Sequence, residues 1–195
     1  MKALLLGLAF SALFAAPSFA ALKVGDTAPD FTATASLAGK DFTFHLYDAL
    51  KKGPAVVYFY PSAYTGGCDL EAHTFADNKD AFVSAGASII GVSADNLQRL
   101  NHFSADPNFC AGKFPVASDE SLTIAKSYDL QTTPAQPGAK DVRGVVIGHG
   151  FIERVTFVVG TNHKIMAVMS SKADKLTPDQ HVTKSLAMVE QMAAK

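Results

Sequence analysis

One cysteine of this sequence, Cys68, stands among residues that can make a sulfur reactive. Thr65, three residues earlier, can place its hydroxyl in the same turn, and Pro61 fixes the backbone and can shield the sulfur from water. Glu71, three residues later, opposes ionisation of the thiol unless an arginine neutralises it, so its expected role is to orient such an arginine. A thiolate is the nucleophilic form of cysteine. The group therefore predicts nucleophilic chemistry at the sulfur of Cys68.

The expected position of Cys68, in the first turn of a helix, favours the thiolate but does not suffice. Free backbone N–H groups and the helix dipole stabilise an anion there by roughly 0.3–2 kcal/mol. Lowering a thiol pKa from about 8.5 to about 6 needs about 3.4 kcal/mol, so a nearby cation is required. Thr65 has a simpler interpretation as the helix N-cap, and both roles are compatible.

The elements that must position Cys68 follow from the hydrophobic pattern. Strands are predicted near residues 31–35, 42–46, 55–60, 88–92, 114–117, 154–159 and 164–169. Helices are predicted near residues 67–84, 96–104 and 121–128, and from Pro178 to the C-terminus with Thr177 as its N-cap. Strand 55–60, the helix after it and strand 88–92 form a right-handed βαβ unit with parallel strands.

The order of these elements predicts a single α/β domain with a thioredoxin-like fold. In that fold a central mixed sheet is flanked by helices, and here an extension is added at the N-terminus. Residues 154–169 predict a β-hairpin. Residues 131–150, with two prolines and four glycines, predict an irregular insertion before the hairpin.

Residues 1–20 have the three-part pattern of a secretory signal peptide, with a charge at Lys2, an apolar run over 3–14 and small residues before the cleavage site. Cleavage after Ala20 leaves residues 21–195 as the mature domain. A membrane anchor is the alternative, but the run is shorter than the roughly 20 apolar residues that a bilayer requires. We expect an exported protein, periplasmic or secreted, that is not inserted in a membrane after cleavage.

The charge of the mature chain argues against several classes of partner. The full chain has 17 Lys and Arg and 18 Asp and Glu, and removal of Lys2 leaves 16 basic residues and a formal net charge of −2. No cluster of basic residues predicts binding to nucleic acid or to an anionic membrane. The six histidines lack metal-ligand spacing, and we expect neither a metal nor an organic cofactor. Arg99 and Arg143 are expected to be solvated.

Cys110 is the second of two cysteines, and the pair allows more than one interpretation. In an exported chain the two can form a structural disulfide, although the 175 residues from 21 to 195 form a sufficient core without it. A thiol–disulfide oxidoreductase requires Cys-x-x-Cys, and this chain has Glu71 at the partner position. A glutathione-peroxidase-like enzyme requires a tryptophan beside its cysteine, and the chain has none.

Residues 56–72, Val-Val-Tyr-Phe-Tyr-Pro-x-x-x-Thr-x-Gly-Cys-x-x-Glu-Ala, resemble the peroxidatic motif of peroxiredoxins, in particular the Q-type (bacterioferritin-comigratory) group. Three further segments resemble the family in the same order: 24–31, 114–119 and 152–157. The last resembles the strand that bears the active-site arginine of the family. The resemblance therefore makes Arg154 the cation that the thiolate requires.

The resemblance implies a thiol-dependent peroxidase that reduces hydrogen peroxide and organic hydroperoxides through a sulfenic acid on Cys68. Arg154 and Thr65 would bind the peroxide, and Pro61 would limit access of water. A resolving thiol would then form a disulfide with Cys68, and a dithiol reductant, a thioredoxin-like protein or another thiol, would restore the enzyme.

The sequence departs from the family at two positions. Many Q-type members carry the resolving cysteine five residues after the first, where this chain has His73, and Gly66 replaces a common proline. Cys110 matches a less usual placement, and we expect it to be the resolving cysteine. The alternatives are a one-cysteine mechanism in which Cys110 is idle, and a non-catalytic secreted module with a Cys68–Cys110 disulfide.

Overall fold

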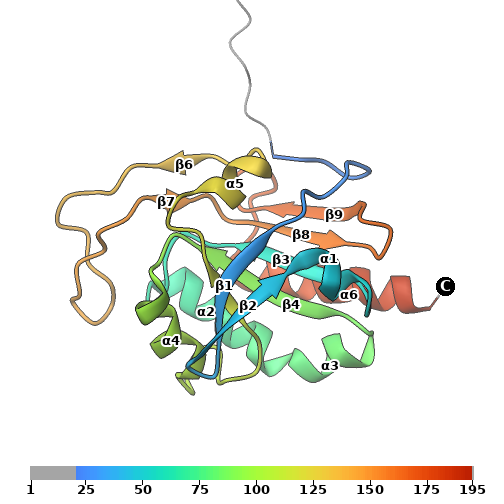
Figure 1. The fold of residues 1–195 in the computed structure, drawn as a ribbon, viewed down its shortest axis with the longest axis horizontal. Coiled ribbons are helices and arrows are strands. Elements are labelled where there is room, and N and C mark those ends of the chain that lie inside the picture. Colours follow the sequence, from blue (N-terminus) through green and yellow to red (C-terminus); the bar gives the residue numbers. More distant parts are fainter. Residues whose placement is uncertain (1–20, 195) are drawn as a thin grey trace, which may run out of the picture.

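A computed structural model describes residues 21–194, in which a mixed seven-stranded sheet forms the centre of the molecule (Figure 1). The predicted signal peptide lies outside these residues. The strand order is β2-β1-β5-β4-β3-β8-β9. The strands are β1 (Thr32–Leu37), β2 (Lys40–His45), β3 (Ala55–Phe59), β4 (Ser88–Ser93), β5 (Val116–Ser118), β8 (Val155–Val159) and β9 (Ile165–Ser170). A separate two-stranded sheet consists of β6 (Thr132–Thr133) and β7 (Phe151–Ile152).

The central strand β3 is buried along its whole length, as its continuous apolar sequence predicts. It pairs in parallel with β4 and antiparallel with β8, which confirms the βαβ unit and the hairpin of β8 and β9. Phe59, the last residue of β3, lies opposite Val155. This register brings Arg154, which precedes Val155, to the carboxyl end of β3, where the chain leads into the segment of Cys68.

The helices are α1 (Leu46–Leu50), α2 (Gly66–Asp77), α3 (Lys79–Ser84), α4 (Leu97–Ala105), α5 (Thr123–Ser127) and α6 (Pro178–Ala193). The single helix predicted over 67–84 is wrong, because it is divided into α2 and α3 at Asn78. The Asn78 side chain donates to the carbonyl of Thr74, and its backbone leaves the helical region. Helix α1 was not predicted. The N-cap of α6 is confirmed, since Thr177 and Gln180 form a capping box.

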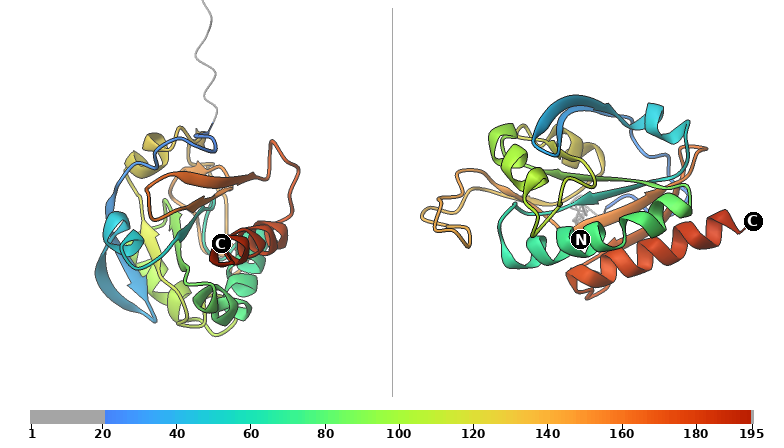
Figure 2. Two further views of the ribbon diagram at one scale, coloured as in Figure 1. Left: turned by 90° about the vertical axis from the view of Figure 1, so that its right-hand side faces the viewer. Right: turned by 90° about the horizontal axis from the view of Figure 1, so that it is seen from below.

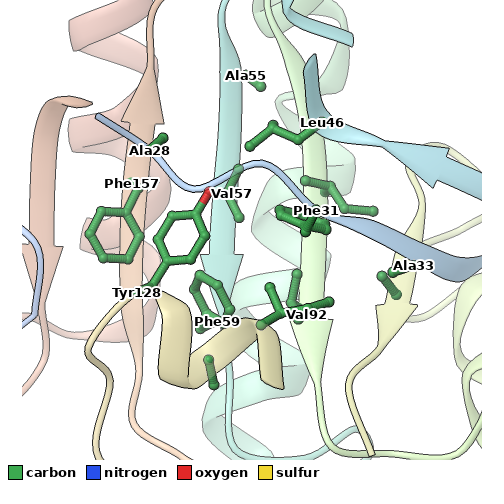
Figure 3. Close-up of a cluster of buried hydrophobic side chains, with 14 of the residues drawn as sticks. Ala28, Phe31, Ala33, Leu46, Ala55, Val57, Phe59, Val92, Tyr128 and Phe157 are labelled. Carbon is green, nitrogen blue, oxygen red and sulfur yellow. The ribbon is translucent and has the colours of Figure 1, made fainter. Parts of the chain in front are cut away.

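Two apolar cores lie on opposite faces of the sheet. The first contains aromatic side chains from the N-terminal extension, from β3 and β8, and from Tyr128 directly after α5; Figure 3 shows Phe59, Tyr128 and Phe157 packed together. The second lies under α2, α3 and α6, which share one side of the sheet (Figure 2), and it also receives Leu100 and Phe103 of α4. Both cysteines belong to this second core.

The insertion (residues 131–150) is irregular apart from β6, as predicted, and extends at one end of the molecule (Figure 1). It returns to the domain at the segment before α2, where the Val142 N–H donates to the Tyr64 carbonyl over 3.0 Å. None of the helices in residues 21–194 combines the length and the apolar character needed to cross a membrane.

Candidate active site

Cys68 lies in the first turn of α2, as predicted from the sequence. Thr65 has the extended backbone of an N-cap residue, and its carbonyl accepts the N–H of Cys68 at 2.7 Å and that of Asp69 at 2.9 Å. The Cys68 residue is only 2% exposed. The sulfur is thus held at the helix start but under a cover of neighbouring side chains.

Arg154 is the cation beside this sulfur. Its Nη2 donates to Cys68 Sγ at 3.1 Å, and its Nη1 donates to Glu71 Oε2. A side chain on Gly67 would have its Cβ 3.3 Å from Arg154 Nη2, so a glycine at this position leaves room for the guanidinium. Residues 86 positions apart in the chain are thereby brought together as expected, and Glu71 has the orienting contact predicted for it.

The Thr65 side chain does not cap the helix, which was the simpler interpretation of this residue. No side-chain hydrogen bond caps α2, and the Thr65 hydroxyl instead donates to the Ser62 carbonyl over 2.8 Å. The same hydroxyl faces the sulfur, where it favours the thiolate. One hydroxyl proton serves one acceptor at a time, so Thr65 must turn from Ser62 to the sulfur when the thiol ionises. Pro61 is partly exposed in the connection from β3, and its shielding role stays a prediction.

Burial raises the pKa of the Cys68 thiol above its ordinary value. Arg154, the Thr65 hydroxyl and the Ser62 N–H act in the opposite direction, and Glu71 adds a smaller increase in this pKa. The sequence-based expectation of a lowered pKa is therefore wrong for this closed conformation, because it omitted the loss of hydration of the thiolate. The donors that favour the thiolate are present, but they do not fully offset burial.

Glu71 is completely buried, and burial raises the pKa of its carboxyl to about 7 although Arg154 acts to lower it. Its Oε1 makes no hydrogen bond and lies 4.0 Å from Nδ1 of His181, a buried residue of α6. Burial also lowers the pKa of His181 to about 4, with the charge of Arg154 as the second cause. His181 is thus a neutral neighbour of the Arg154–Glu71 pair.

Cys110 occupies a different environment, after α4, with its side chain fully buried in the second core. Burial, followed by the carboxylates of Asp106 and Asp69, raises the pKa of this thiol well above its ordinary value. Both cysteines are free thiols in the structure. The conformation described is therefore that of the reduced chain, without a disulfide between them.

Sequence reasoning missed a charged network next to Cys68. Asp95, buried after β4, accepts from the Ser62 hydroxyl and the Ala63 N–H, and Arg99 and His149 contact it at 2.8 Å each. The expectation that Arg99 is solvated is wrong, whereas Arg143 is exposed, as expected. The Arg99 side chain is 11% exposed and also contacts Asp141, and Arg143 binds Asp141 and stacks on the Tyr64 ring. The residues of this network are far apart in the sequence, so no local motif indicated that they meet.

Within residues 21–194 no three His, Cys, Asp or Glu side chains come together in a way that could hold a metal ion. The chemistry at Cys68 is carried by sulfur, a guanidinium, a hydroxyl and backbone donors. These groups match what a thiol needs to attack an electrophilic oxygen.

Comparison with known proteins identifies the family of this chain. Residues 24–168 match the model of the AhpC/TSA family. Peroxiredoxin Q of Sedum lineare chloroplasts is 27% identical, over 89% of this chain and 81% of that protein. Peroxiredoxin Bcp of Escherichia coli is 29% identical, over 74% of this chain and 83% of that protein.

Solved structures show the same fold. The crystal structure of the peroxidoxin BcpB from Mycobacterium tuberculosis superposes with a TM-score of 0.68 at 28% identity, and the match covers 88% of this chain and 98% of that chain. The family match, these relatives and the shared fold lead to one conclusion. The chain belongs to the AhpC/TSA family, and it is a peroxiredoxin, a thiol-dependent peroxidase.

Proposed function

We propose that Cys68 is the nucleophile of this peroxidase and that Cys110 resolves its oxidised form. The observation that carries the first part is the contact of Arg154 Nη2 with Cys68 Sγ at 3.1 Å, at the first turn of a helix. A guanidinium at this distance favours the thiolate and remains beside the oxygen atoms of a peroxide that approaches the sulfur.

In the first step the Cys68 thiolate attacks the terminal oxygen of a hydroperoxide. The S–O bond forms while the O–O bond breaks, so the sulfur becomes a sulfenic acid and the departing oxygen leaves as water or an alcohol after it gains a proton. Arg154 and the Thr65 hydroxyl supply donors for the charge that develops on the departing oxygen. The peroxide is reduced by two electrons, and the sulfur loses them.

In the second step the Cys110 thiol attacks the sulfenic sulfur, which forms a disulfide and releases water. A dithiol reductant then exchanges with this disulfide and returns both cysteines to thiols. The shared apolar core supports Cys110 as the partner. Since both sulfurs are buried, an external reductant reaches the disulfide only if the start of α2 or the segment around Cys110 moves. If Cys110 is idle, the reductant must instead attack the sulfenic acid directly.

Steady-state and single-turnover peroxide reduction test the two assignments. Cys68→Ser should lower peroxide consumption by roughly 10³-fold or more, to the background of free peroxide and thiol. Cys110→Ser, with Cys110→Ala as a second variant, should reduce one equivalent of peroxide at the normal rate but lose recycling by a dithiol. Retained turnover in Cys68→Ser would overturn the assignment of Cys68 as the nucleophile. Normal recycling in both Cys110 variants would support the one-cysteine alternative.

We also propose that the chain is exported and acts outside the cytoplasm, on the pattern of residues 1–20. The expected mature protein begins at Ala21. Absence of the protein from both the periplasmic fraction and the culture medium would contradict export, and a full-length mass for the exported protein would contradict cleavage after Ala20.

A further inference from the structure

Residues 61–65, in the segment between β3 and α2, are here called the catalytic loop, and hydrogen bonds to neighbouring elements hold this loop along its length. The Ser62 hydroxyl and the Ala63 N–H donate to Asp95 at 2.9 and 2.7 Å, and the Ala63 carbonyl accepts from Arg99 Nη2 at 2.7 Å. These ties matter because Tyr64 has φ of +59°, a left-handed backbone that a tyrosine adopts at a cost of about 1–3 kcal/mol. The loop needs external contacts to keep this conformation.

The insertion supplies further contacts, in addition to the hydrogen bond from the Val142 N–H to the Tyr64 carbonyl. Arg143 is fixed by its guanidinium hydrogen bonds to Asp141, and its guanidinium carbon lies 3.2 Å from the centre of the Tyr64 ring. At the other end of the insertion, His149 Nε2 lies 2.8 Å from Asp95 Oδ1 and 3.3 Å from the Ser62 hydroxyl. The insertion therefore holds the catalytic loop from two sides, once through Tyr64 and once through Asp95.

The partners of His149 define its protonation state. Its Nδ1 lies 2.7 Å from the Gly150 carbonyl, which only accepts hydrogen bonds. Its Nε2 faces Asp95, which also receives the Ala63 N–H, the Ser62 and Ser93 hydroxyls and the Arg99 contact. A carboxylate surrounded by these donors is ionised and only accepts. Both ring nitrogens must therefore carry hydrogen, so His149 is an imidazolium in this conformation.

The hydrogen bonds between Asp95 and the catalytic loop affect the Cys68 sulfur through Ser62. The Ser62 carbonyl accepts the Thr65 hydroxyl at 2.8 Å, and the Ser62 N–H favours the thiolate form of Cys68. A loop released from Asp95 would misplace both Thr65 and the Ser62 N–H at the same time. The geometry points to His149 as a positioning residue whose protonated ring, through Asp95, holds the catalytic loop in its reactive conformation. This role rests on Cys68 being the nucleophile.

The charges that face His149 set the direction of its pH dependence. Burial is the largest single influence and would lower the pKa of His149. The hydrogen bond to Asp95, the charge of Asp95 and the hydrogen bond to the Gly150 carbonyl together outweigh burial, so this pKa is raised, while the charge of Arg99 opposes the increase. The support that His149 gives is therefore fully present below the unfolded value of about 6.5 and is lost as the pH rises through the raised value. The groups around the ring are Asp95 after β4, Arg99 and His102 of α4, and Asp141 and Arg143 of the insertion.

Hydrogen exchange of the reduced full chain tests this role without depending on activity. The readout is the exchange rate of peptides covering the catalytic loop and the start of α2, corrected for the intrinsic effect of pH. We expect roughly tenfold slower exchange at about pH 5.5 than at about pH 8.5, the size expected for one hydrogen bond to a charged group. His149→Asn, which stays neutral, should exchange fast at both values. His102 is an exposed histidine that lines the same surface pocket as His149, and His102→Asn should behave as the native chain.

The rate of Cys68 oxidation by hydrogen peroxide gives the second readout. His149→Asn should be roughly tenfold slower than the native chain at about pH 5.5 and equal to it at about pH 8.5. If His149→Asn were slower by the same factor at both pH values, the loss would be purely structural and the proposal would be overturned. Hydrogen exchange in His149→Asn that kept the pH dependence of the native chain would also overturn it. Failure of the nucleophile assignment is recognised separately, because Cys68→Ser would then keep its peroxide consumption while the exchange data still followed His149.

Discussion

The two cysteines share one apolar core but differ in the polar groups that face them. Cys68 has a guanidinium at 3.1 Å, the Thr65 hydroxyl and the Ser62 N–H, all of which favour a thiolate. Cys110 has the carboxylates of Asp106 and Asp69 as its charged neighbours, and both oppose a thiolate. Burial raises both pKa values, so burial does not distinguish the two sulfurs. The difference lies in whether donors or acceptors surround the buried sulfur.

This comparison separates two tasks of a thiol peroxidase. The sulfur that meets the peroxide needs donors already in place, since they stabilise the charge on the departing oxygen without further rearrangement. A sulfur that reacts only after the first has been oxidised gains from being unreactive until then, because a thiol with a raised pKa is protected from oxidation. The acidic surroundings of Cys110 fit the second task.

The largest effect on this contrast should come from removing the guanidinium. Arg154→Gln takes the charged donor from Cys68 and should lower the rate of its oxidation by roughly 100-fold, the usual loss for one oriented donor at a developing oxyanion. Arg154→Lys keeps a charge but cannot bind Cys68 and Glu71 together, so it should recover part of the rate. Stopped-flow oxidation of the reduced variants measures both, and equal rates for the native chain and Arg154→Gln would remove the basis of the contrast.

A smaller effect should appear in the pH dependence of the native chain. Because the pKa of Cys68 is raised, the thiolate fraction at neutral pH is small and grows with pH. The rate of oxidation by peroxide should therefore rise by roughly tenfold for each pH unit below that pKa, less the roughly tenfold loss expected where His149 gives up its proton. A rate that is level from about pH 6 upward would mean that the sulfur is already ionised, and that Arg154 and Thr65 outweigh burial.

The smallest effect should appear in stability. Cys110→Ser places a hydroxyl in an apolar pocket with acidic neighbours, which should lower the free energy of unfolding by about 1–3 kcal/mol. Cys68→Ser leaves the hydroxyl beside Arg154 and should cost less than about 1 kcal/mol. Urea unfolding of the two variants measures the difference, and the reverse order would show that the two pockets are wrongly described.

Much of the fold follows from local sequence patterns. The apolar run of β3 and the capping residues of α6 determine elements whose signals lie within a few neighbours, so they were predictable. The division of α2 from α3 was not, because it depends on one side chain, Asn78, bonding to the preceding turn. The five-residue helix α1 is too short to produce a periodic signal.

The candidate site divides in the same way. Thr65, Cys68 and Glu71 lie in one segment, and the family resemblance added Arg154 from a distant strand. The network around Asp95 joins residues from four separate parts of the chain. No sequence pattern predicts that these residues come together. The raised pKa of Cys68 was also unpredictable, since it depends on the depth of burial rather than on residue types.

We propose that Cys68, through its contact with Arg154, is the sulfur that peroxide oxidises first. The most direct measurement treats the reduced Cys110→Ser variant with one equivalent of hydrogen peroxide in the presence of a reagent that traps sulfenic acids, and locates the adduct by peptide mass spectrometry. We expect an adduct on Cys68 in nearly every molecule, and its loss when Arg154→Gln is added and the reaction time is kept short. An unmodified Cys68 after the peroxide has been consumed would show that Cys68 is not the first sulfur to be oxidised.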